Sequence, residues 1–166
     1  MTIQVEPDEA SFLEAAPALQ VIRWFNTAAP LNLDVLCGKV VVLHAFQMLC
    51  PGCVYHGIPQ MQRIQRQFDA VDVAVIGLHT VFEHHNVMSP EALAVFIHEN
   101  RLTFPIGIDT PDGGGSRPLT MRAYKMKGTP TLILIDRQGR QRFHLFGQES
   151  DLGVGAAIGQ LLPERG

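Results

Sequence analysis

The sequence predicts an α/β domain with a partly parallel central sheet. Three apolar stretches of strand composition begin at Val40, Val71 and Phe104. Between them, apolar residues recur at spacings of three and four, which is typical of amphipathic helices. Because strand–helix–strand therefore occurs twice in succession, we expect parallel pairing with right-handed crossovers. A chain of 166 residues, 46% hydrophobic and 17% charged, is long enough for one globular core.

Residues 1–19 are weakly patterned, and we expect an N-terminal arm there, followed by one domain over residues 20–166. Phe12, Leu13 and Leu19 could pack as a short helix or as an extended segment. Residues 1–9 are acidic and lack the basic and apolar regions of a secretory signal, which favours a cytoplasmic protein if this is the native start. A net charge of −3, and no apolar run near the roughly 20 residues of a membrane span, argue against nucleic-acid and membrane partners.

The first half of the domain opens with a predicted strand over residues 21–25, which carries the only tryptophan. A connector over residues 30–38 follows, and its leucines should dock on the core. After the strand that begins at Val40, a helix has its apolar face in Val54, Ile58, Met61, Ile64 and Phe68. Pro59 lies within this helix, removes one backbone hydrogen bond and should kink the axis.

The second half continues with a strand over residues 71–78 and a helix that starts at Ser89-Pro90-Glu91, an N-cap, a first-position proline and an acidic first turn. The strand over residues 104–108 leads into a glycine-rich loop at 109–118, which lacks the pattern of a phosphate-binding loop. We then expect a short helix at 121–126, a hairpin of residues 131–135 with 142–146, and a last helix capped by Ser150 or Asp151 that runs to Leu162.

Two cysteines close the first long strand and open the helix behind it, in the order Cys50-Pro51-Gly52-Cys53. This places Cys50 at the N-cap and Pro51 at the first helical position. Unpaired N–H groups and the helix dipole favour a thiolate there, so we expect a lowered pKa for Cys50 and assign it the attacking role. Cys53, one turn further on, would resolve the mixed disulfide. A structural zinc site needs about four ligands, and the only other cysteine, Cys37, is interpreted as a free thiol.

These landmarks resemble the thioredoxin fold, a mixed central sheet flanked by helices. Gly128-Thr129-Pro130-Thr131 stands before a late strand, as in that fold, and the order of motifs is similar to the TlpA/ResA-like thiol–disulfide oxidoreductases over roughly residues 20–162. Three further segments match that family, namely 24–27, 36–41 and 76–80. The resemblance implies a cis peptide bond before Pro130, contact of Pro130 with both sulfurs, and pairing of the Thr129 backbone with an extended substrate. Pro51, Gly52 and His79 complete the expected substrate surface.

Several positions depart from the family pattern. Leu49 replaces the usual aromatic residue before the first cysteine, and Pro59 comes one residue late. His44 stands where thioredoxins have a buried acidic residue, and His56 stands where many relatives have glutamate. His44 could accept the Cys53 proton with a pKa near neutrality, or be a hydrogen-bonded core residue. His56 could share the proton-handling role or simply face solvent.

Four polar residues follow the strand over 71–78, at the sheet edge where α/β proteins bind ligands. They have three interpretations: a wall of the substrate groove, a metal site, or a solvated loop. We expect no metal ion. The residues are His79, Glu83, His84 and His85.

The sequence therefore predicts a thiol–disulfide oxidoreductase that needs no cofactor beyond its own cysteines. Its partners would be protein or small-molecule disulfides and an upstream thiol reductant. One alternative is a peroxiredoxin-like thiol peroxidase, which requires Pro-x-x-x-Thr-x-x-Cys, but here Leu43 and Gln47 occupy the proline and threonine positions. A second alternative is a non-enzymatic, redox-sensitive adaptor.

Overall fold

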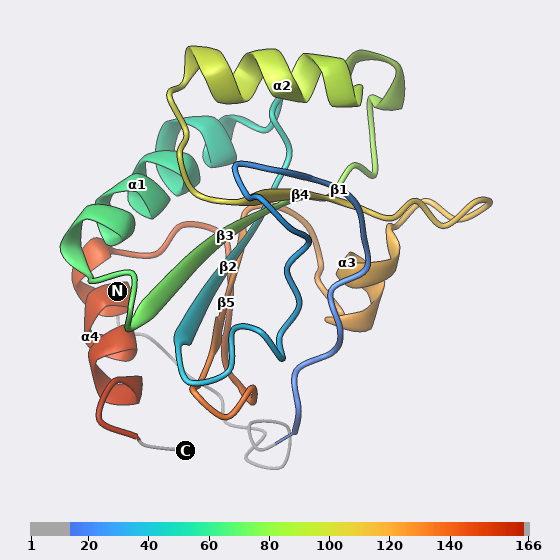
Figure 1. Ribbon diagram of the computed structural model, residues 1–166. Coiled ribbons are helices and arrows are strands. Elements are labelled where there is room, and N and C mark those ends of the chain that lie inside the picture. Colours follow the sequence, from blue (N-terminus) through green and yellow to red (C-terminus); the bar gives the residue numbers. More distant parts are fainter. Residues whose placement is uncertain (1–13, 165–166) are drawn as a thin grey trace.

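A six-stranded mixed sheet organises residues 14–164, the part of the chain that the computed structural model describes (Figure 1). The strand order is β1-β4-β3-β2-β5-β6, in which β4, β3 and β2 run parallel and the other pairs are antiparallel. The predicted parallel pairing and the β5–β6 hairpin are confirmed. The strands are β1 (Val21–Phe25), β2 (Val40–Phe46), β3 (Val73–His79), β4 (Ile106–Asp109), β5 (Thr131–Ile135) and β6 (Gln141–Phe146).

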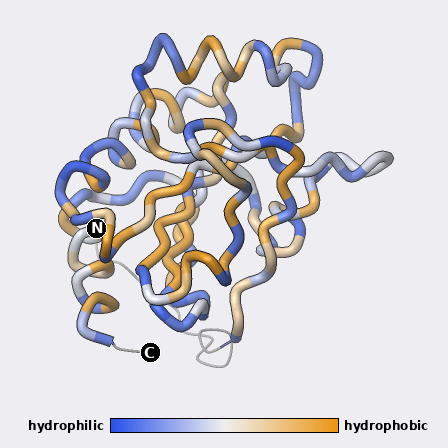
Figure 2. Tube along the Cα trace, viewed as in Figure 1, coloured by the Kyte–Doolittle hydropathy of each residue, from blue (hydrophilic) through white to orange (hydrophobic). Residues whose placement is uncertain are grey.

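Helices cover both faces of the sheet, as expected for the thioredoxin-like fold. Side chains of α1 (Ile58–Gln67), α2 (Pro90–Glu99) and α4 (Asp151–Leu161) share one core with Val40, Val42 and Phe46 of β2. The alternate residues of β2 face a second core with α3 (Leu119–Ala123) and the connector before β2. Because both faces are covered, β2 and β5 are buried along their whole length and consist mostly of apolar residues (Figure 2).

Two strands begin two residues later than predicted, each for a local reason. Asp69 starts a turn that accepts hydrogen bonds from Val71 N and Asp72 N, so Val71 is 73% exposed and β3 starts at Val73. Phe104 is fully buried but precedes the ladder, and its carbonyl accepts a bond from the Asn26 side chain. Apolar composition therefore located both strands but not their first paired residues, because Val71 is exposed in a turn and Phe104 is buried outside the ladder.

Side-chain caps set the starts of α2 and α4. Ser89 Oγ accepts from Ala92 N at 3.1 Å, and Ser150 Oγ accepts from Gly153 N at 3.1 Å, so Ser150 is the cap of the last helix. The short helix α3 begins at Leu119, earlier than predicted. The buried Asp109 carboxylate accepts bonds from Thr120 N at 2.8 Å and Met121 N at 2.9 Å and so anchors its first turn.

The helix behind the cysteines accommodates Pro59 through a wider turn. Helical backbone starts at Pro51, becomes a π-helix over Cys53–Gly57 and continues as α1. In the π-turn, Ile58 N donates to Cys53 O, five residues back. Pro59 has no N–H for the Tyr55 carbonyl, and the family proline would stand one residue earlier. A π-turn is the expected way to absorb one extra residue in a helix.

Residues 14–20 run along the domain beside the β5–β6 turn. Ala15 bridges Arg140, and Ala16 N donates to Gly139 O at 2.8 Å. Leu19 packs on the α3-side core, whereas Phe12 and Leu13 lie outside the described residues. The boundary between an arm and a domain at residue 20 stays a prediction.

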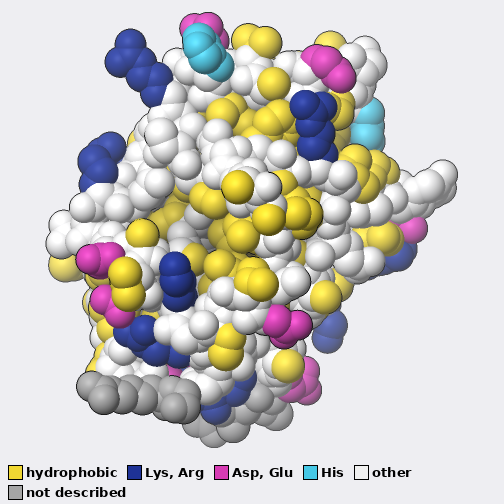
Figure 3. All heavy atoms as spheres, in the orientation of Figure 1, with side chains coloured by type: hydrophobic (Ala, Val, Ile, Leu, Met, Phe, Trp, Pro, Cys, Tyr) yellow, Lys and Arg dark blue, Asp and Glu magenta, His cyan; other side chains and the backbone are white. Residues whose placement is uncertain are grey.

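The connector before β2 docks its leucines as expected, with Leu36 buried and Leu31 and Leu33 partly buried against the α3-side core. Ile22 and Val35 remain exposed, and Figure 3 shows apolar side chains gathered on the face where β1 lies. Within residues 14–164, no helix has the length and apolar character of a bilayer span.

Candidate active site

Cys50 lies just past the end of β2, where the chain turns into the helix. Cys50 N donates to Gln47 O at 3.0 Å, and Cys50 O accepts from Val54 N at 3.0 Å, so Cys50 occupies the predicted N-cap position. Its side chain is partly exposed, and its Sγ lies 3.6 Å from the carbonyl oxygen of Thr129. A disulfide in solution can therefore approach this sulfur.

Cys53 is fully buried one turn further along. Burial, with a hydrogen bond to Cys50, raises the pKa of the Cys53 thiol to about 12, although bonds from the Gln47 backbone and Thr129 act in the opposite direction. Both cysteines are free thiols here. The two sulfurs thus differ sharply, since one is accessible and the other is a shielded thiol in contact with the first.

Thr129 and Pro130 face the cysteine turn from the start of β5. The Thr129–Pro130 peptide bond is cis, which confirms the expectation from the family resemblance. A Cβ on Gly52 would lie 3.3 Å from Pro130 Cδ, so the proline ring packs directly on the cysteine turn. Glycine at position 52 permits this close approach.

His44 is buried beneath the helix start, on the β2 face that carries Phe46. A Cβ on Gly57 would lie 2.5 Å from the imidazole Nε2 and Cε1 atoms, so the ring occupies the space that a side chain at Gly57 would need. Among the described residues, no group hydrogen-bonds His44 Nε2. Burial, helped by the nearby charge of His56, lowers the pKa of His44 to about 3. The expected pKa near neutrality is therefore wrong, because desolvation keeps this imidazole neutral.

His56 is half-buried on the π-turn, near His44. Its Nε2 donates to the carbonyl of Glu149 at 3.0 Å, which leaves Nδ1 as the ring's acceptor nitrogen. The same carbonyl accepts from Gln60 Nε2 at 2.9 Å. A hydrogen-bonded link thus joins the cysteine helix to the loop before α4.

His79 does not reach the substrate side of the site as expected. The ring is buried, packs against Phe46, and its Nε2 accepts from Met48 N at 3.2 Å. Burial lowers the pKa of His79 to about 4. His79 thus holds the loop that leads to Cys50. Of the four residues predicted to form a wall of the substrate groove, Glu83 and His84 line the cavity beside Cys50, and His79 and His85 do not. Within residues 14–164, no three His, Cys, Asp or Glu side chains are grouped for a metal ion.

A cavity of about 330 Å³ opens beside Cys50. Sequence reasoning missed most of its apolar wall, because that wall comes from three separate loops and the end of β6. Phe146, at the end of β6, is 54% exposed, which only the structure shows. The lining residues are Gln47, Leu49, Cys50, Pro51, Phe82, Glu83, His84, Met88, Gly128, Thr129 and Phe146.

The two positions that a thiol peroxidase would need are used differently here. Leu43 points into the α3-side core, away from the helix that carries the cysteines. The Gln47 side chain is buried and accepts a bond from Phe82 N at 3.1 Å, and its amide nitrogen lies 3.4 Å from Glu83 Oε1. Neither position presents a hydroxyl group to Cys50.

An accessible cysteine at a helix start, a buried cysteine behind it and a cis-proline packed on the turn between them define a thioredoxin-like redox domain. Residues 14–143 match the AhpC/TSA family, and the chain belongs to that family. The domain is an oxidoreductase of this class.

Two solved structures are similar to nearly the whole chain. A thioredoxin-like superfamily protein is 55% identical, with a TM-score of 0.89 over 90% of this chain and 97% of that one. A thiol-disulfide isomerase from Corynebacterium glutamicum is 52% identical, with a TM-score of 0.86 over the same shares.

Curated relatives are more distant. The sporulation thiol-disulfide oxidoreductase A of Bacillus subtilis is 27% identical over 80% of this chain and 75% of its own length. NHL repeat-containing protein 2 of Gallus gallus is 28% identical over 76% of this chain, but the match spans only 17% of that protein.

Proposed function

We propose that this domain exchanges thiols and disulfides through a Cys50–Cys53 pair. The observation that carries the proposal is the contrast between the two sulfurs, one partly exposed at the cavity and one fully buried behind it. Cys50 attacks a substrate disulfide, forms a mixed disulfide and releases one substrate thiol. Cys53 then attacks Cys50 Sγ and releases the second thiol. Two electrons pass to the substrate, and the domain is left as a Cys50–Cys53 disulfide for an upstream thiol reductant to reduce.

Thr129, Pro130, Pro51 and Gly52 form the substrate-facing surface in this proposal. Support comes from the position of Thr129 on the cavity wall and the close packing of Gly52 on Pro130. An extended peptide could pair with the Thr129 backbone as a short added strand. Protein or small-molecule disulfides are the proposed partners, and a cytoplasmic location stays a prediction.

His56 is the better candidate for proton exchange with the cysteines, and His44 is assigned a positioning role. The pKa of His44, about 3, makes it too weak a base to hold a proton at neutral pH. His56 is half-buried, lies one turn after Cys53 and keeps an acceptor nitrogen available. A His56→Gln variant can still donate to the Glu149 carbonyl. It should change the pH profile of turnover more than the stability of the fold.

The main experiment is the reduction of insulin disulfides with dithiothreitol as the electron source. Cys50→Ser should abolish turnover, because no attacking sulfur remains. Cys53→Ser should accumulate mixed disulfides that mass spectrometry detects. Cys37→Ser is the matched control: Cys37 is exposed, with its Sγ 3.5 Å from Arg137 O, and the variant should keep full activity. Turnover by Cys50→Ser would refute the proposal. The proposal would also fail if Cys53→Ser trapped one dominant partner and the wild type did not reduce insulin.

A further inference from the structure

The cavity beside Cys50 is apolar on one side and carries a carboxylate on the other. Phe82, Met88 and Phe146 supply apolar surface, and Glu83 supplies the only acidic side chain of the lining. A volume of about 330 Å³ suits one or two side chains of a substrate. A side chain that fills it should match both walls, with an apolar stem and a positively charged end.

Glu83 is held in place by a buried amide. Gln47 is 1% exposed, and its Oε1 accepts from Phe82 N at 3.1 Å, which fixes the orientation of the amide. Its Nε2 is then directed at Glu83 Oε1, 3.4 Å away. Because a buried amide is costly to leave unpaired, Gln47 keeps the acidic wall beside the cysteine turn.

The charge of Glu83 is not neutralised inside the molecule. Within residues 14–164, no lysine, arginine or histidine nitrogen lies within 4.0 Å of its carboxylate, and the polar group that contacts it is the neutral Gln47 amide. By contrast, the carboxylates of Asp72, Asp136 and Asp151 are all paired with arginines. An unpaired carboxylate on a cavity wall next to the attacking sulfur is available to a cation on the substrate.

We propose that this cavity is a subsite for a long basic side chain, lysine or arginine, that lies next to the reactive cysteine of a substrate polypeptide. The methylene stem would pack on Phe82, Met88 and Phe146, and the charged end would meet Glu83. This inference rests on the proposed function and names its substrate class. The chemistry is unchanged: two thiols of the domain are oxidised, and one peptide disulfide is reduced to two peptide thiols.

The experiment is a single-turnover reaction of the fully reduced protein with disulfide-linked peptide dimers, followed by chromatography of the released thiol. Three dimers differ only at the residue next to cysteine, which is lysine, leucine or glutamate. The lysine dimer should react about two- to fivefold faster than the leucine dimer, the range expected for a solvent-accessible ion pair, and the glutamate dimer should be slowest. High salt should reduce this spread.

Variants separate charge recognition from structural damage. Glu83→Gln should remove the preference for lysine, and Glu83→Lys should reverse the order of the lysine and glutamate dimers. Glu99→Gln changes an exposed carboxylate at the end of α2 and should keep the wild-type order. Equal rates for the three dimers with the wild type would overturn the subsite and leave the proposed function standing, as would an equal slowing of all three by Glu83→Gln. No reaction with any dimer would overturn the proposed function itself.

Discussion

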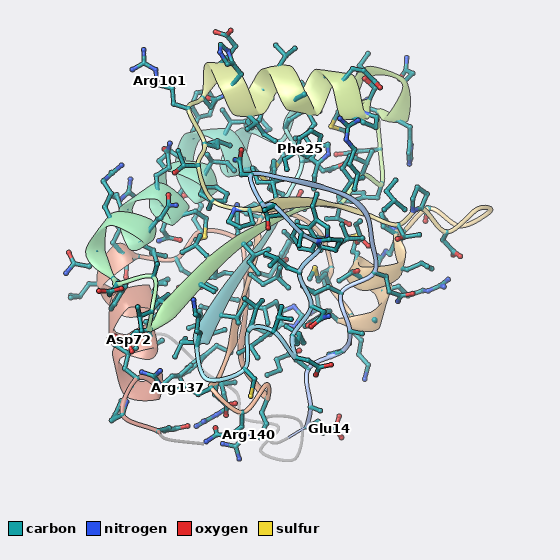
Figure 4. The ribbon with its side chains drawn as sticks, in the orientation of Figure 1. Glu14, Phe25, Asp72, Arg101, Arg137 and Arg140 are labelled. Atoms are coloured by element: carbon teal, nitrogen blue, oxygen red, sulfur yellow. The ribbon has the colours of Figure 1, made fainter. Side chains whose placement is uncertain are left out.

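The two ends of the parallel strands β2 and β3 are built on different principles. At the amino end, Arg137 donates to Gly38 O at 2.6 Å, to Asp72 Oδ1 at 3.0 Å and to Leu162 O at 3.0 Å. Asp72, Arg137 and Arg140 lie at the lower end of the molecule in Figure 4. Asp136, buried beside them, accepts bonds from Arg140 Nε at 2.8 Å and from Arg142 Nη1 at 3.2 Å. Charged groups at this end have partners.

At the carboxyl end, polar and charged groups are less completely paired. In the described part of the chain, this end has a buried thiol, an imidazole nitrogen without a hydrogen-bond partner, a π-turn and a carboxylate without a cation. Leu49 and Phe146 are also more than half exposed there. Unpaired polar groups and exposed apolar side chains cost stability, and here they gather at the end of the sheet that carries Cys50. We infer that the amino end stabilises the fold and that the carboxyl end carries the proposed chemistry.

The largest expected effect is a loss of stability in mild acid, which arises from two histidines near the carboxyl end. Burial lowers the pKa values of His44 and His79 to about 3 and about 4, from 6.5 in the unfolded chain. The unfolded chain therefore binds protons that the folded one does not, and stability falls as the pH drops below 6.5 towards 4. At pH 5 the loss should be about 2 kcal/mol for each histidine.

Urea unfolding between pH 7 and pH 5 measures this loss. A His98→Gln control should show the same decline, since His98 is exposed on α2. Hydrogen bonds from Arg140 and Arg142 outweigh burial and lower the pKa of Asp136, so its contribution is lost only in stronger acid, below about pH 4. A flat stability profile from pH 7 to pH 5 would contradict the assignment of both histidines.

Removing the central carboxylate of the amino end should have the next largest effect. Asp136→Ala leaves Arg140 and Arg142 without their buried acceptor and should cost about 3 kcal/mol of unfolding free energy. Disulfide reduction at 25 °C should be nearly unchanged. Asp34→Ala, at an exposed position of the connector, is the matched control. Equal stability of the two variants would remove the claim that this end anchors the fold.

The contact between Gly57 and His44 can be tested as a pair. Gly57→Ala places a methyl group 2.5 Å from the imidazole and should destabilise the protein by about 2 kcal/mol through overpacking. In a His44→Ala background the same change should cost far less, because the ring is gone. A double-mutant cycle by urea unfolding measures the coupling, and additive losses would show that another neighbour of Gly57 is responsible.

The smallest effect is a gain in stability. His44→Leu removes a buried nitrogen that has no partner among residues 14–164 and should stabilise the fold by about 1 kcal/mol. Insulin reduction should slow, because the helix start that carries Cys53 packs on this ring through Gly57. A stability gain with unchanged turnover would assign His44 to packing alone.

Local patterns in the sequence were sufficient to predict the helices and strands and the positions of Cys50 and Cys53. Apolar runs, helical spacing and the Ser89 and Ser150 caps act between neighbours in the chain, so they predicted the strands, the helices and the N-cap position of Cys50. The same kind of signal misplaced the start of β3, because Val71 N donates to the Asp69 side chain in a turn and not to the neighbouring strand.

Only the tertiary structure decided the environments of the histidines and the shape of the cavity. His44 is 2% exposed and its pKa is lowered because residues far apart in the chain cover it. The bond that His79 accepts from Met48 N and the Gln47–Glu83 contact also join residues far apart in the chain. Desolvation depends on what covers a group from every side, and a sequence read in one dimension carries no measure of that cover.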